Sequence, residues 1–425
     1  MLKNTFSLNE KQFPKFKKQL EYIYTNSKTY HEKLKECGIT PNDIQSIDDL
    51  DKLPLTTKND FHKSSIYDYY CVPENKIARF HASSGSTGKP TIVGLTKNDL
   101  KLRNQMIITQ CQKTGITSDD VIQICYGYGM FTGGLGFHEA LSEYGCTIVP
   151  TGSGNSEKQL YYMKKLRTTV LISGPYYALH LAEVAKQKGI DVKNFNLKII
   201  KVGSELVTEK MRQKLKEAWG QQVIISQDYG MTELIGPCAA SECPFQNGMH
   251  IYEDNFIIEL VDPITKQTTD KNTGELVIST LNNECFPLIR YATNDIVTLE
   301  TTPCKCGNHT IKIKKIIGRA DDMLKIKGVK VFLSQIEDFI LSYDFCTPNY
   351  EIVLTKKNFV DQVEINIEYN KPSYFNNSNN EQTLANAFQN YFGIKANINL
   401  INPNTIKQTT GKAKKIKDLR TEKAL

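Results

Sequence analysis

The sequence has no apolar run of the length that a membrane-spanning helix needs, and its first residues contain no uninterrupted apolar segment of signal-peptide length. We therefore expect a cytoplasmic protein without a membrane partner. Its 11 cysteines are an odd number scattered over 425 residues, unlike the disulfide framework of a small secreted domain. Most of them are expected to be reduced and buried. The chain also has no internal repeat and no extended low-complexity tract.

A large net charge is missing as well, because 53 Lys and Arg against 46 Asp and Glu leave a formal charge of +7. With 40% hydrophobic and 23% charged residues, the composition excludes a disordered or collagen-like chain. The length favours two or three domains. Residues 401–425 contain six Lys and one Arg against two acids, so this segment carries +5 of the total. A nucleic-acid-binding protein would spread its charge over one face among aromatic side chains, so we expect no nucleic-acid partner.

From Ala78 onward, apolar β-rich runs alternate with amphipathic helical runs, which is typical of a mostly parallel sheet covered by helices. Before this region, residues 8–70 resemble polar helices with turns, and for the segment Asp48–Pro54 within them we expect a packing role. The predicted strands are Val121–Cys125, Thr147–Val149, Val170–Ile172, Leu197–Val202 and Val223–Ser226, and the predicted helices are Lys97–Thr114, Ser156–Leu166, Tyr176–Lys188 and Thr208–Trp219.

After Gly248 the pattern changes to short strands separated by polar loops, and then to a small α+β unit. The short strands are Phe256–Val261, Gly274–Ile278 and Ile296–Glu300, and the later elements are a helix Leu333–Tyr343, a long strand Asn349–Tyr369, a helix Glu381–Phe392 and a strand Ala396–Ile401. We predict an α/β fold. A large N-terminal α/β domain over residues 1–318 has mostly parallel sheets and a β-rich subdomain, and a small mobile C-terminal α+β domain covers residues 319–425.

The segment His81–Thr91 reads HASSGSTGKPT and contains an unbroken run of small Ser, Thr and Gly residues before Lys89. Exposed backbone N–H groups, hydroxyls and one cation suit a polyphosphate. A Walker A loop is excluded, because it would need Gly at Ser83 and Ser or Thr at Pro90. The alternative is a flexible surface loop. The candidate phosphate-binding residues are Ser83, Ser84, Gly85, Ser86, Thr87, Gly88 and Lys89.

A second glycine cluster, Tyr126–Gly136, reads YGYGMFTGGLG directly after a predicted strand. It fails as a dinucleotide fingerprint, because Thr132 stands where G-x-G-x-x-G needs Gly. Aromatic rings beside glycines suggest flat apolar walls with room for a ring between them, and a Tyr/Phe core cluster is the alternative. The candidate residues are Tyr126, Tyr128, Phe131, Gly133 and Gly134.

Three cysteines and one histidine flank the predicted β-rich region: Cys243, His250, Cys304 and Cys306. A Cys₃His set is one that structural Zn²⁺ accepts, although the spacing here is not C-x₂-C. Two interpretations stay open, a zinc site or unrelated reduced thiols. Cys238 and His309 are replacements if one ligand is wrong.

Seven segments in order resemble the successive motifs of adenylate-forming, AMP-binding enzymes, and more narrowly those of phenylacetate–CoA ligases. They cover roughly residues 77–415 and read HASSGSTGKPT, YGYGMFTGGLGFHEA, GSELVTEKMR, DYGMTELIGP, GELVIST with PLIRYATNDIV, GRADDMLKIKGVKVFLSQIE and TGKAKK. The resemblance implies an AMP-forming acid–thiol ligase that uses ATP, Mg²⁺ and CoA. Such an enzyme converts an aryl or arylacetic acid to acyl-AMP and then to acyl-CoA. The family is often homodimeric, which makes a homodimer the expectation by analogy.

The resemblance also implies a role for each matching residue. Tyr229 lies against adenine, Thr232 contacts the α-phosphate, Glu233 holds Mg²⁺ and Asp295 binds the ribose hydroxyls. Lys412 bridges carboxylate and α-phosphate during adenylation, whereas Lys414, Lys415 and Lys417 are expected to be solvated. The remaining implied nucleotide contacts are Gly203, Ser204, Glu205, Asp228, Gly230, Met231 and Arg319, and Asp321 marks the inter-domain hinge.

The sequence departs from the family pattern at Ala292, where the family has an arginine, so the neutralisation of phosphate or carboxylate there is in doubt. The pair Met231-Thr232 replaces a common Leu-Ser. Two rival functions remain. One is an adenylating enzyme that loads its acid onto a carrier-protein phosphopantetheine, and the other is a non-catalytic nucleotide- or nucleic-acid-binding protein.

Overall fold

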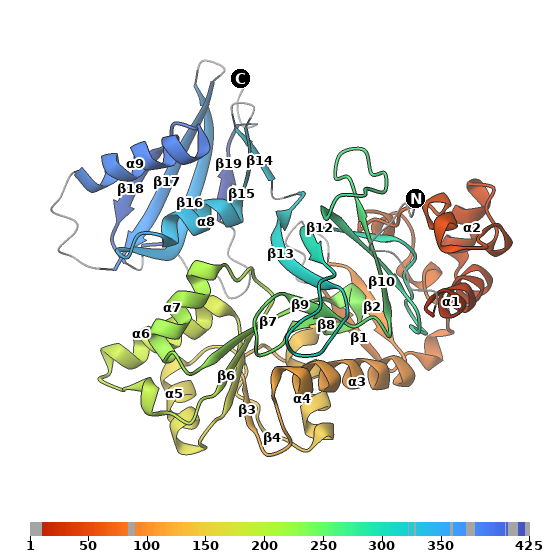
Figure 1. Ribbon diagram of the computed structural model, residues 1–425, viewed down its shortest axis with the longest axis horizontal. Helices are drawn as coiled ribbons and strands as arrows, with labels where there is room; N and C mark the ends of the chain where they lie inside the picture. Colours follow the sequence, from red (N-terminus) through yellow and green to blue (C-terminus); the bar gives the residue numbers. More distant parts are fainter. Residues whose placement is uncertain are drawn as a thin grey trace. The chain divides into compact units, whose positions relative to one another are not determined.

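The computed structural model describes residues 11–83, 90–321, 323–326, 329–357, 360–370, 379–403, 405–406 and 415–420 (Figure 1). The chain forms two compact units, residues 1–207 with 214–316, and residues 208–213 with 317–425. The predicted division of labour, an ATP and acyl domain over residues 1–318 and a catalytic lid over residues 319–425, stays a prediction.

Two helices and a series of short 3₁₀ turns precede the first strand of the larger unit. They are α1 (Phe13–Asn26), α2 (Lys28–Glu36), η1 (Pro41–Asp43), η2 (Ile47–Lys52), η3 (Asp60–His62), η4 (Ile66–Asp68) and η5 (Glu74–Lys76). Helix α1 buries Phe16, Leu20 and Ile23, which recur at helical spacing on one face. The Tyr22 hydroxyl lies within hydrogen-bond distance of two backbone carbonyls, including that of Glu284 at 2.9 Å. The predicted packing role of Asp48–Pro54 is confirmed at Leu50 and Leu53, which are buried in the main core cluster.

The parallel half of the main sheet follows the predicted alternation of strands and helices. Its elements are α3 (Lys97–Thr114), β3 (Val121–Ile124), α4 (Thr132–Tyr144), β4 (Thr147–Val149), α5 (Ser156–Lys165), β5 (Val170–Ser173), α6 (Pro175–Gln187), η6 (Val192–Asn194), β6 (Ile199–Val202), α7 (Glu209–Trp219) and β7 (Ile224–Met231). Neighbouring strands in the order β7-β6-β5-β3-β4 are all parallel. In Figure 1, α5 and α6 lie on one side of these strands and α3 and α4 on the other. Strands β5 and β6 are buried at every residue and are mostly apolar, with Ser173 and Lys201 as the exceptions.

Beyond β7 the same sheet continues with antiparallel pairs. The added elements are η7 (Thr232–Leu234), β8 (Gly236–Glu242), β9 (Met249–Ile251), β10 (Phe256–Val261), β11 (Thr273–Thr280), β12 (Tyr291–Glu300) and β13 (Lys312–Arg319). Within the described residues the 11 strands lie in the order β10-β11-β12-β13-β9-β8-β7-β6-β5-β3-β4. The α/β class is confirmed. The predicted β-rich subdomain is the antiparallel half of one mixed sheet, and it begins at Gly236 rather than after Gly248.

A separate antiparallel pair, β1 (Arg79–Ala82) and β2 (Ile92–Leu95), flanks the Ser/Thr/Gly run. The Ser83 N–H donates to the Thr91 carbonyl at 2.9 Å, and the Thr91 N–H donates to the Ser83 Oγ at 2.9 Å. The candidate residues Ser84–Lys89 lie outside the described residues. The described residues on either side of this segment are therefore hydrogen-bonded to each other.

The smaller unit has its own sheet and core. Its elements are β14 (Met323–Ile326), β15 (Val329–Phe332), α8 (Leu333–Leu341), β16 (Cys346–Lys357), β17 (Val360–Tyr369), α9 (Asn379–Phe392), β18 (Asn397–Ile401) and β19 (Ile416–Asp418). Among the described residues, four strands lie in the order β18-β17-β16-β19. The predicted single strand Asn349–Tyr369 is wrong, because β16 and β17 pair antiparallel with Lys357 opposite Val360. Strands of more than ten residues are uncommon, which favours a hairpin for so long an apolar pattern.

The basic C-terminal segment is not wholly solvated. The Lys415 side chain is 15% exposed, its Nζ lies 2.7 Å from the Glu337 carboxylate, and it stands 4.4 Å from the centre of the Tyr350 ring. Lys417 is more exposed and pairs with Glu351 at 2.8 Å. The prediction that Lys415 is solvated is therefore wrong, because the hydrogen bond from the Ile352 N–H to the Lys415 carbonyl holds this residue against β16. Lys414 lies outside the described residues.

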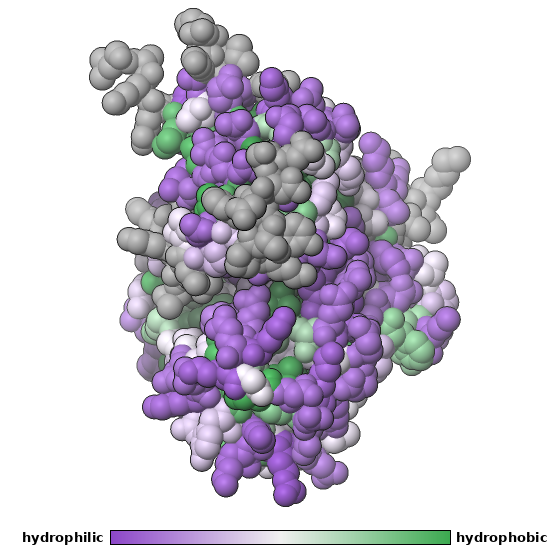
Figure 2. Space-filling model, turned by 90° about the vertical axis from the view of Figure 1, so that its left-hand side faces the viewer, coloured by the Kyte–Doolittle hydropathy of each residue, from purple (hydrophilic) through white to green (hydrophobic). Residues whose placement is uncertain are grey.

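The surface is mainly hydrophilic on the face that Figure 2 shows, where hydrophobic residues lie in small patches separated by hydrophilic ones. Exposed large hydrophobic residues are spread over several elements, such as Tyr161 on α5, Ile264 between β10 and β11, and Tyr391 on α9. Scattered apolar residues of this kind are ordinary for a protein surface. In the part of the chain that the structure describes, no helix has both the length and the hydropathy that a bilayer crossing requires.

Candidate functional site

Two of the predicted nucleotide-binding residues meet in the larger unit. Tyr229 on β7 donates its hydroxyl hydrogen to Oδ2 of Asp295 on β12 over 2.7 Å, across 66 positions of sequence. Each residue is only 7% exposed. The Asp295 N–H also donates to the Thr293 hydroxyl at 3.1 Å, so both its backbone and its carboxylate are held. The arrangement gives the carboxylate a defined direction.

Ala292, the departure from the family pattern, lies in an apolar environment. Its side chain belongs to a small buried cluster with Val261 and Val277, against which Leu55 packs. Its N–H donates to the Thr56 carbonyl at 2.8 Å. A methyl group suits these surroundings, whereas a cation would be desolvated there. The surroundings of Ala292 therefore suit the residue that this chain has at the position.

The motif residues Gly230–Glu233 lie at a tight hairpin between β7 and β8. A Cβ atom at Gly230 would stand 2.4 Å from the Gly236 carbonyl oxygen, so only glycine fits. Thr232 and Glu233 are buried in η7, and Ile235 directly after it has φ +58°. A β-branched residue in the left-handed region costs about 1–3 kcal/mol, and such strain is concentrated at functional sites.

The loop Gly203–Glu205 after β6 is joined to the glycine-aromatic cluster. The Tyr126 hydroxyl lies 2.8 Å from the Ser173 carbonyl oxygen and 3.1 Å from that of Gly203. Ser204 has φ +65°, and a Cβ atom on Gly174 would lie 3.2 Å from the Glu205 carboxylate. Burial raises the pKa of Tyr126 above its ordinary value, so the phenol stays a donor. This tyrosine connects the candidate acyl and nucleotide residues.

Asp228 has a structural partner that the sequence interpretation missed. Its carboxylate lies 2.7 Å from the Lys201 ammonium, and Ser241 also donates to it. Burial alone would lower the pKa of the wholly buried Lys201, but the nearby carboxylate outweighs it and raises that pKa. The signal was a lysine inside the buried strand β6, since a charge in such a run needs a partner.

The glycine-aromatic cluster packs more tightly than its sequence suggests. The Tyr126 and Phe131 rings meet edge to face with centroids 5.8 Å apart, and the Tyr128 hydroxyl lies 3.3 Å from Nδ1 of His138. A Cβ atom at Gly134 would lie 2.4 Å from the Gly127 carbonyl oxygen, and one at Gly133 would lie 2.5 Å from the Phe131 ring. The space beside both glycines is therefore filled by the chain itself, which lets the first turn of α4 approach the cluster.

Of the candidate residues in the smaller unit, Arg319 and Asp321 are among the described residues and Lys412 is not. In the smaller unit, Arg319 donates Nε–H and Nη2–H to the two oxygens of Asp321 at 2.9 and 3.1 Å. This two-point contact holds the guanidinium plane. Lys412 lies outside the described residues, so its catalytic role stays a prediction.

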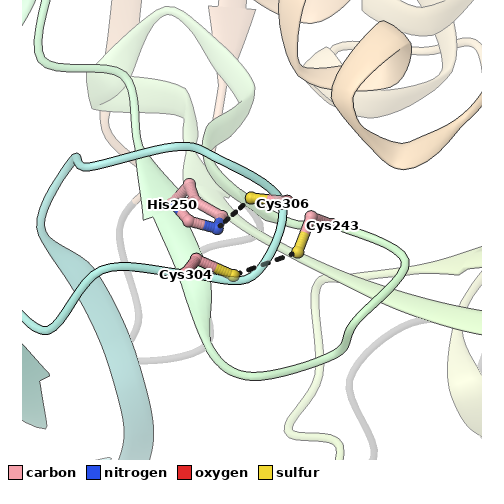
Figure 3. A group of neighbouring side chains, drawn as sticks. All are labelled: Cys243, His250, Cys304 and Cys306. Atoms are coloured by element: carbon pink, nitrogen blue, oxygen red, sulfur yellow. Dashed lines mark hydrogen bonds between the residues drawn. The ribbon is translucent and has the colours of Figure 1, made fainter.

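The four predicted metal ligands come together as a candidate metal centre (Figure 3). Cys243 follows β8, His250 lies on β9, and Cys304 and Cys306 lie between β12 and β13. Their ligand atoms are all within 4.8 Å of one another. The Sγ atoms of Cys243 and Cys304 are 3.7 Å apart, and the Sγ of Cys306 is 3.5 Å from Nε2 of His250. Within the described residues, the cluster does not include Cys238 or His309.

Comparison with known proteins assigns the chain to a family. The AMP-binding enzyme family matches residues 20–283, and the AMP-binding enzyme C-terminal domain matches residues 328–420. A phenylacetate-coenzyme A ligase of Pseudomonas putida is 34% identical over 420 residues, 97% of this chain and 94% of that protein. One of Thermus thermophilus is 36% identical over 365 residues, 85% of this chain and 82% of that protein.

Among solved structures, 2-hydroxyisobutyryl-CoA ligase in the postadenylation state with 2-HIB-AMP has the same fold. Its TM-score is 0.90 at 22% identity, over 98% of this chain and 91% of that chain. The motif order, the meeting of Tyr229 with Asp295 and the near-full-length relatives agree, and the chain belongs to the AMP-binding enzyme family.

Proposed function

We propose that the chain activates an aryl or arylacetic acid with ATP to an acyl-adenylate and then transfers the acyl group to coenzyme A. Its relatives make it an AMP-forming acid–thiol ligase of the phenylacetate–CoA ligase type. The alternative of a non-catalytic nucleotide- or nucleic-acid-binding protein is therefore wrong. The hydrogen bond between Tyr229 and Asp295 carries the proposal, because it joins the residues to which the family resemblance assigns adenine and ribose.

The nucleotide is held at its base and sugar by these two residues. The Asp295 carboxylate accepts hydrogen bonds from the ribose hydroxyls, and the Tyr229 hydroxyl fixes the direction of that carboxylate. The Tyr229 ring lies against adenine, beside the loop of Gly203, Ser204 and Glu205. Gly230 and Met231 also lie on the side of the adenine that we assign to the Tyr229 ring.

Cations and N–H donors stabilise the charge that develops on the α-phosphate when the acid attacks. Ser83–Lys89 supplies backbone N–H groups, hydroxyls and an ammonium, and Thr232 supplies a further hydroxyl. Arg319 and Lys412 add positive charge from the smaller unit. Glu233 is a buried carboxylate that fits Mg²⁺, which would neutralise phosphate charge when bound.

The acyl group lies beside Tyr126, Tyr128 and Phe131. Their rings offer apolar faces, and burial of an apolar ring stabilises the complex by roughly 25 cal/mol per Å². The link from Tyr126 to the Gly203 carbonyl supports this assignment, since the carboxylate must reach the nucleotide α-phosphate. Gly133 and Gly134 have no side chains, which lets the first turn of α4 pack closely against these aromatic residues.

The Cys₃His cluster would hold a structural Zn²⁺ ion through three thiolates and one imidazole. A tetrahedral zinc with ordinary Zn–S and Zn–N lengths separates two sulfur ligands by about 3.8 Å and a sulfur from a nitrogen by about 3.5 Å. The separations of 3.7 and 3.5 Å in this cluster support that ion. Nδ1 of His250 lies 3.3 Å from the Thr310 hydroxyl, a contact that would orient the imidazole.

ATP–pyrophosphate exchange across a panel of acids, with and without CoA, tests the proposed function. We expect exchange that depends on phenylacetate or a benzoate, and AMP and acyl-CoA formation once CoA is added. Preference for acetate or a long fatty acid would contradict the aryl assignment. Exchange without transfer to CoA would instead favour the alternative acceptor, a carrier-protein phosphopantetheine.

A further inference from the structure

A buried histidine connects the start of the Ser/Thr/Gly run with the glycine-aromatic cluster. His81 lies on β1 and is 1% exposed. Its Nδ1 is 3.1 Å from the Met130 carbonyl oxygen, and the neighbouring Ala82 N–H donates to the same oxygen at 2.9 Å. Because a carbonyl oxygen can only accept, the proton of the neutral imidazole lies on Nδ1. One backbone carbonyl thus joins the end of β1 to the cluster through two hydrogen bonds.

The second ring nitrogen faces a buried cation. Nε2 of His81 lies 3.5 Å from Nη1 of Arg103, whose side chain on α3 is fully buried. With the proton on Nδ1, Nε2 is the acceptor and the guanidinium the donor. Burial, Arg103 and Arg79 lower the pKa of His81 below its ordinary value and outweigh the hydrogen bond to Met130 and the charge of Glu139, which raise it. The surroundings therefore favour one tautomer of the neutral ring.

Arg103 is itself fixed from several sides. Its guanidinium pairs with Glu139 of α4, which also binds Arg79 at 2.6 Å. The carbon chain of Arg103 fills the space beside two glycines. A Cβ atom on Gly236 would lie 3.0 Å from it, and one on Gly136 would lie 3.8 Å away. Gly236 follows the Tyr229–Glu233 motif, and Gly136 belongs to the glycine-aromatic cluster. Arg103 therefore contacts residues of three motifs, counting His81.

We propose that His81 is a positioning residue for acyl-adenylate formation, and that it fixes the start of the phosphate-binding run at Ser83 relative to the acyl cluster at Met130. This inference rests on the proposed function, which places ATP phosphates at that run and the acid at that cluster. Carboxylate attack on the α-phosphate needs the reacting atoms about 3–3.5 Å apart and aligned. If the phosphate-binding run and the acyl cluster could shift relative to each other, the rate of acyl-adenylate formation would be lower. Transfer to CoA from acyl-AMP already formed does not need that alignment.

Two isosteric variants separate positioning from packing. His81→Asn can place an amide N–H where Nδ1–H lies and keep the bond to Met130. His81→Gln reaches toward the Nε2 position and loses that bond. We expect His81→Gln to lower the kcat of acid-dependent pyrophosphate exchange at least tenfold, with CoA transfer from supplied acyl-AMP within twofold of wild type. We expect His81→Asn to stay within threefold in both assays. His62→Gln, at an exposed histidine, is the matched control.

The inference is overturned if His81→Gln adenylates at the wild-type rate, if both variants lose equal activity, or if both half-reactions fall together. Should His81→Gln melt below the assay temperature, Glu139→Gln tests the same network through the anchor of Arg103. For Glu139→Gln, a three- to tenfold lower rate of acyl-AMP formation with normal CoA transfer supports the inference. An unchanged rate of acyl-AMP formation overturns it. Wild-type protein without acid-dependent exchange would contradict the proposed function itself, before any variant is compared.

Discussion

At the scale of single residues, the contact between Tyr229 and Asp295 gives a direction to the carboxylate that we propose for the ribose hydroxyls. Both side chains are buried, so the carboxylate depends on protein donors for its orientation. A hydrogen bond to a charged group contributes about 1.5–3 kcal/mol, and leaving a buried acceptor without its donor adds a desolvation cost. The tyrosine hydroxyl should therefore matter for nucleotide affinity in addition to the ring.

We predict that Tyr229→Phe raises the KM for ATP about tenfold or more, since about 1.4 kcal/mol corresponds to a factor of ten. The ring is kept, so the KM for the acid should stay within twofold. Steady-state kinetics of pyrophosphate release with ATP varied checks this. Tyr391→Phe, on a tyrosine that is 71% exposed, is the control. An unchanged KM for ATP in Tyr229→Phe would remove ribose orientation as a role for this hydroxyl.

The order of the motifs predicted which residues belong to the candidate site. It did not predict which of these residues contact each other. The resemblance named Tyr229 and Asp295, but their hydrogen bond spans β7 and β12, which are separated in sequence by a chain of other strands. The sequence also showed no sign of the apolar cluster that surrounds Ala292. His81 stands at the start of a motif, but its buried contact with Arg103 gave no signal, since neither residue has a sequence pattern that marks a partner.

At the scale of elements, the Cys₃His cluster joins the end of β8 and strand β9 to the connection between β12 and β13. These elements lie far apart along the chain, with Cys243 and Cys304 separated by 61 positions. A bound metal would therefore hold the antiparallel half of the sheet together, because its affinity for the folded site adds to the free energy of unfolding.

We predict one zinc ion per chain by metal analysis, and loss of that zinc with a lower Tm in Cys304→Ser. The Tm falls because the site loses one of four ligands. Cys37→Ser, at an exposed cysteine outside the cluster, should keep both the metal and the Tm. Metal-free protein with an unchanged Tm and full activity would contradict the zinc assignment.

Elements were predictable where their pattern was periodic and of ordinary length. Helix α3 and strands β4 and β10 have the predicted ends, because a capping box at Thr96 or a buried apolar run marks them clearly. The β16–β17 hairpin was missed, since alternation continues on both sides of the reversal. The joining of the two halves of the main sheet was also missed, because a strand's partner is not encoded in its own residues.

At the scale of the whole molecule, the lysine that we propose as catalytic belongs to the smaller unit, whereas most of the residues proposed for ATP and the acid belong to the larger unit. The proposed role of Lys412 requires it during adenylation alone, since CoA must later reach the acyl-adenylate. A residue used in one half-reaction leaves a kinetic signature that a residue used in both does not.

We predict that Lys412→Ala abolishes acyl-AMP formation but keeps CoA transfer from supplied acyl-AMP within threefold. Single-turnover assays of the two half-reactions check this. Lys417→Ala, at a lysine of the same segment that is 60% exposed and pairs with Glu351, is the matched control and should leave both rates unchanged. An equal loss in both half-reactions of Lys412→Ala would contradict a step-specific role.

The short strand β19 has a consequence for how the chain can be shortened. It pairs in parallel with β16 at one border of the smaller unit's sheet, and β16 is 12 residues long. Strand β19 pairs with Ile352, Val353 and Leu354 of β16, and unpaired backbone at these residues is a template for strand addition from another copy. A chain cut before Lys415 would lose β19 and expose that edge, so we expect it to self-associate and to be a poor substitute for Lys412→Ala.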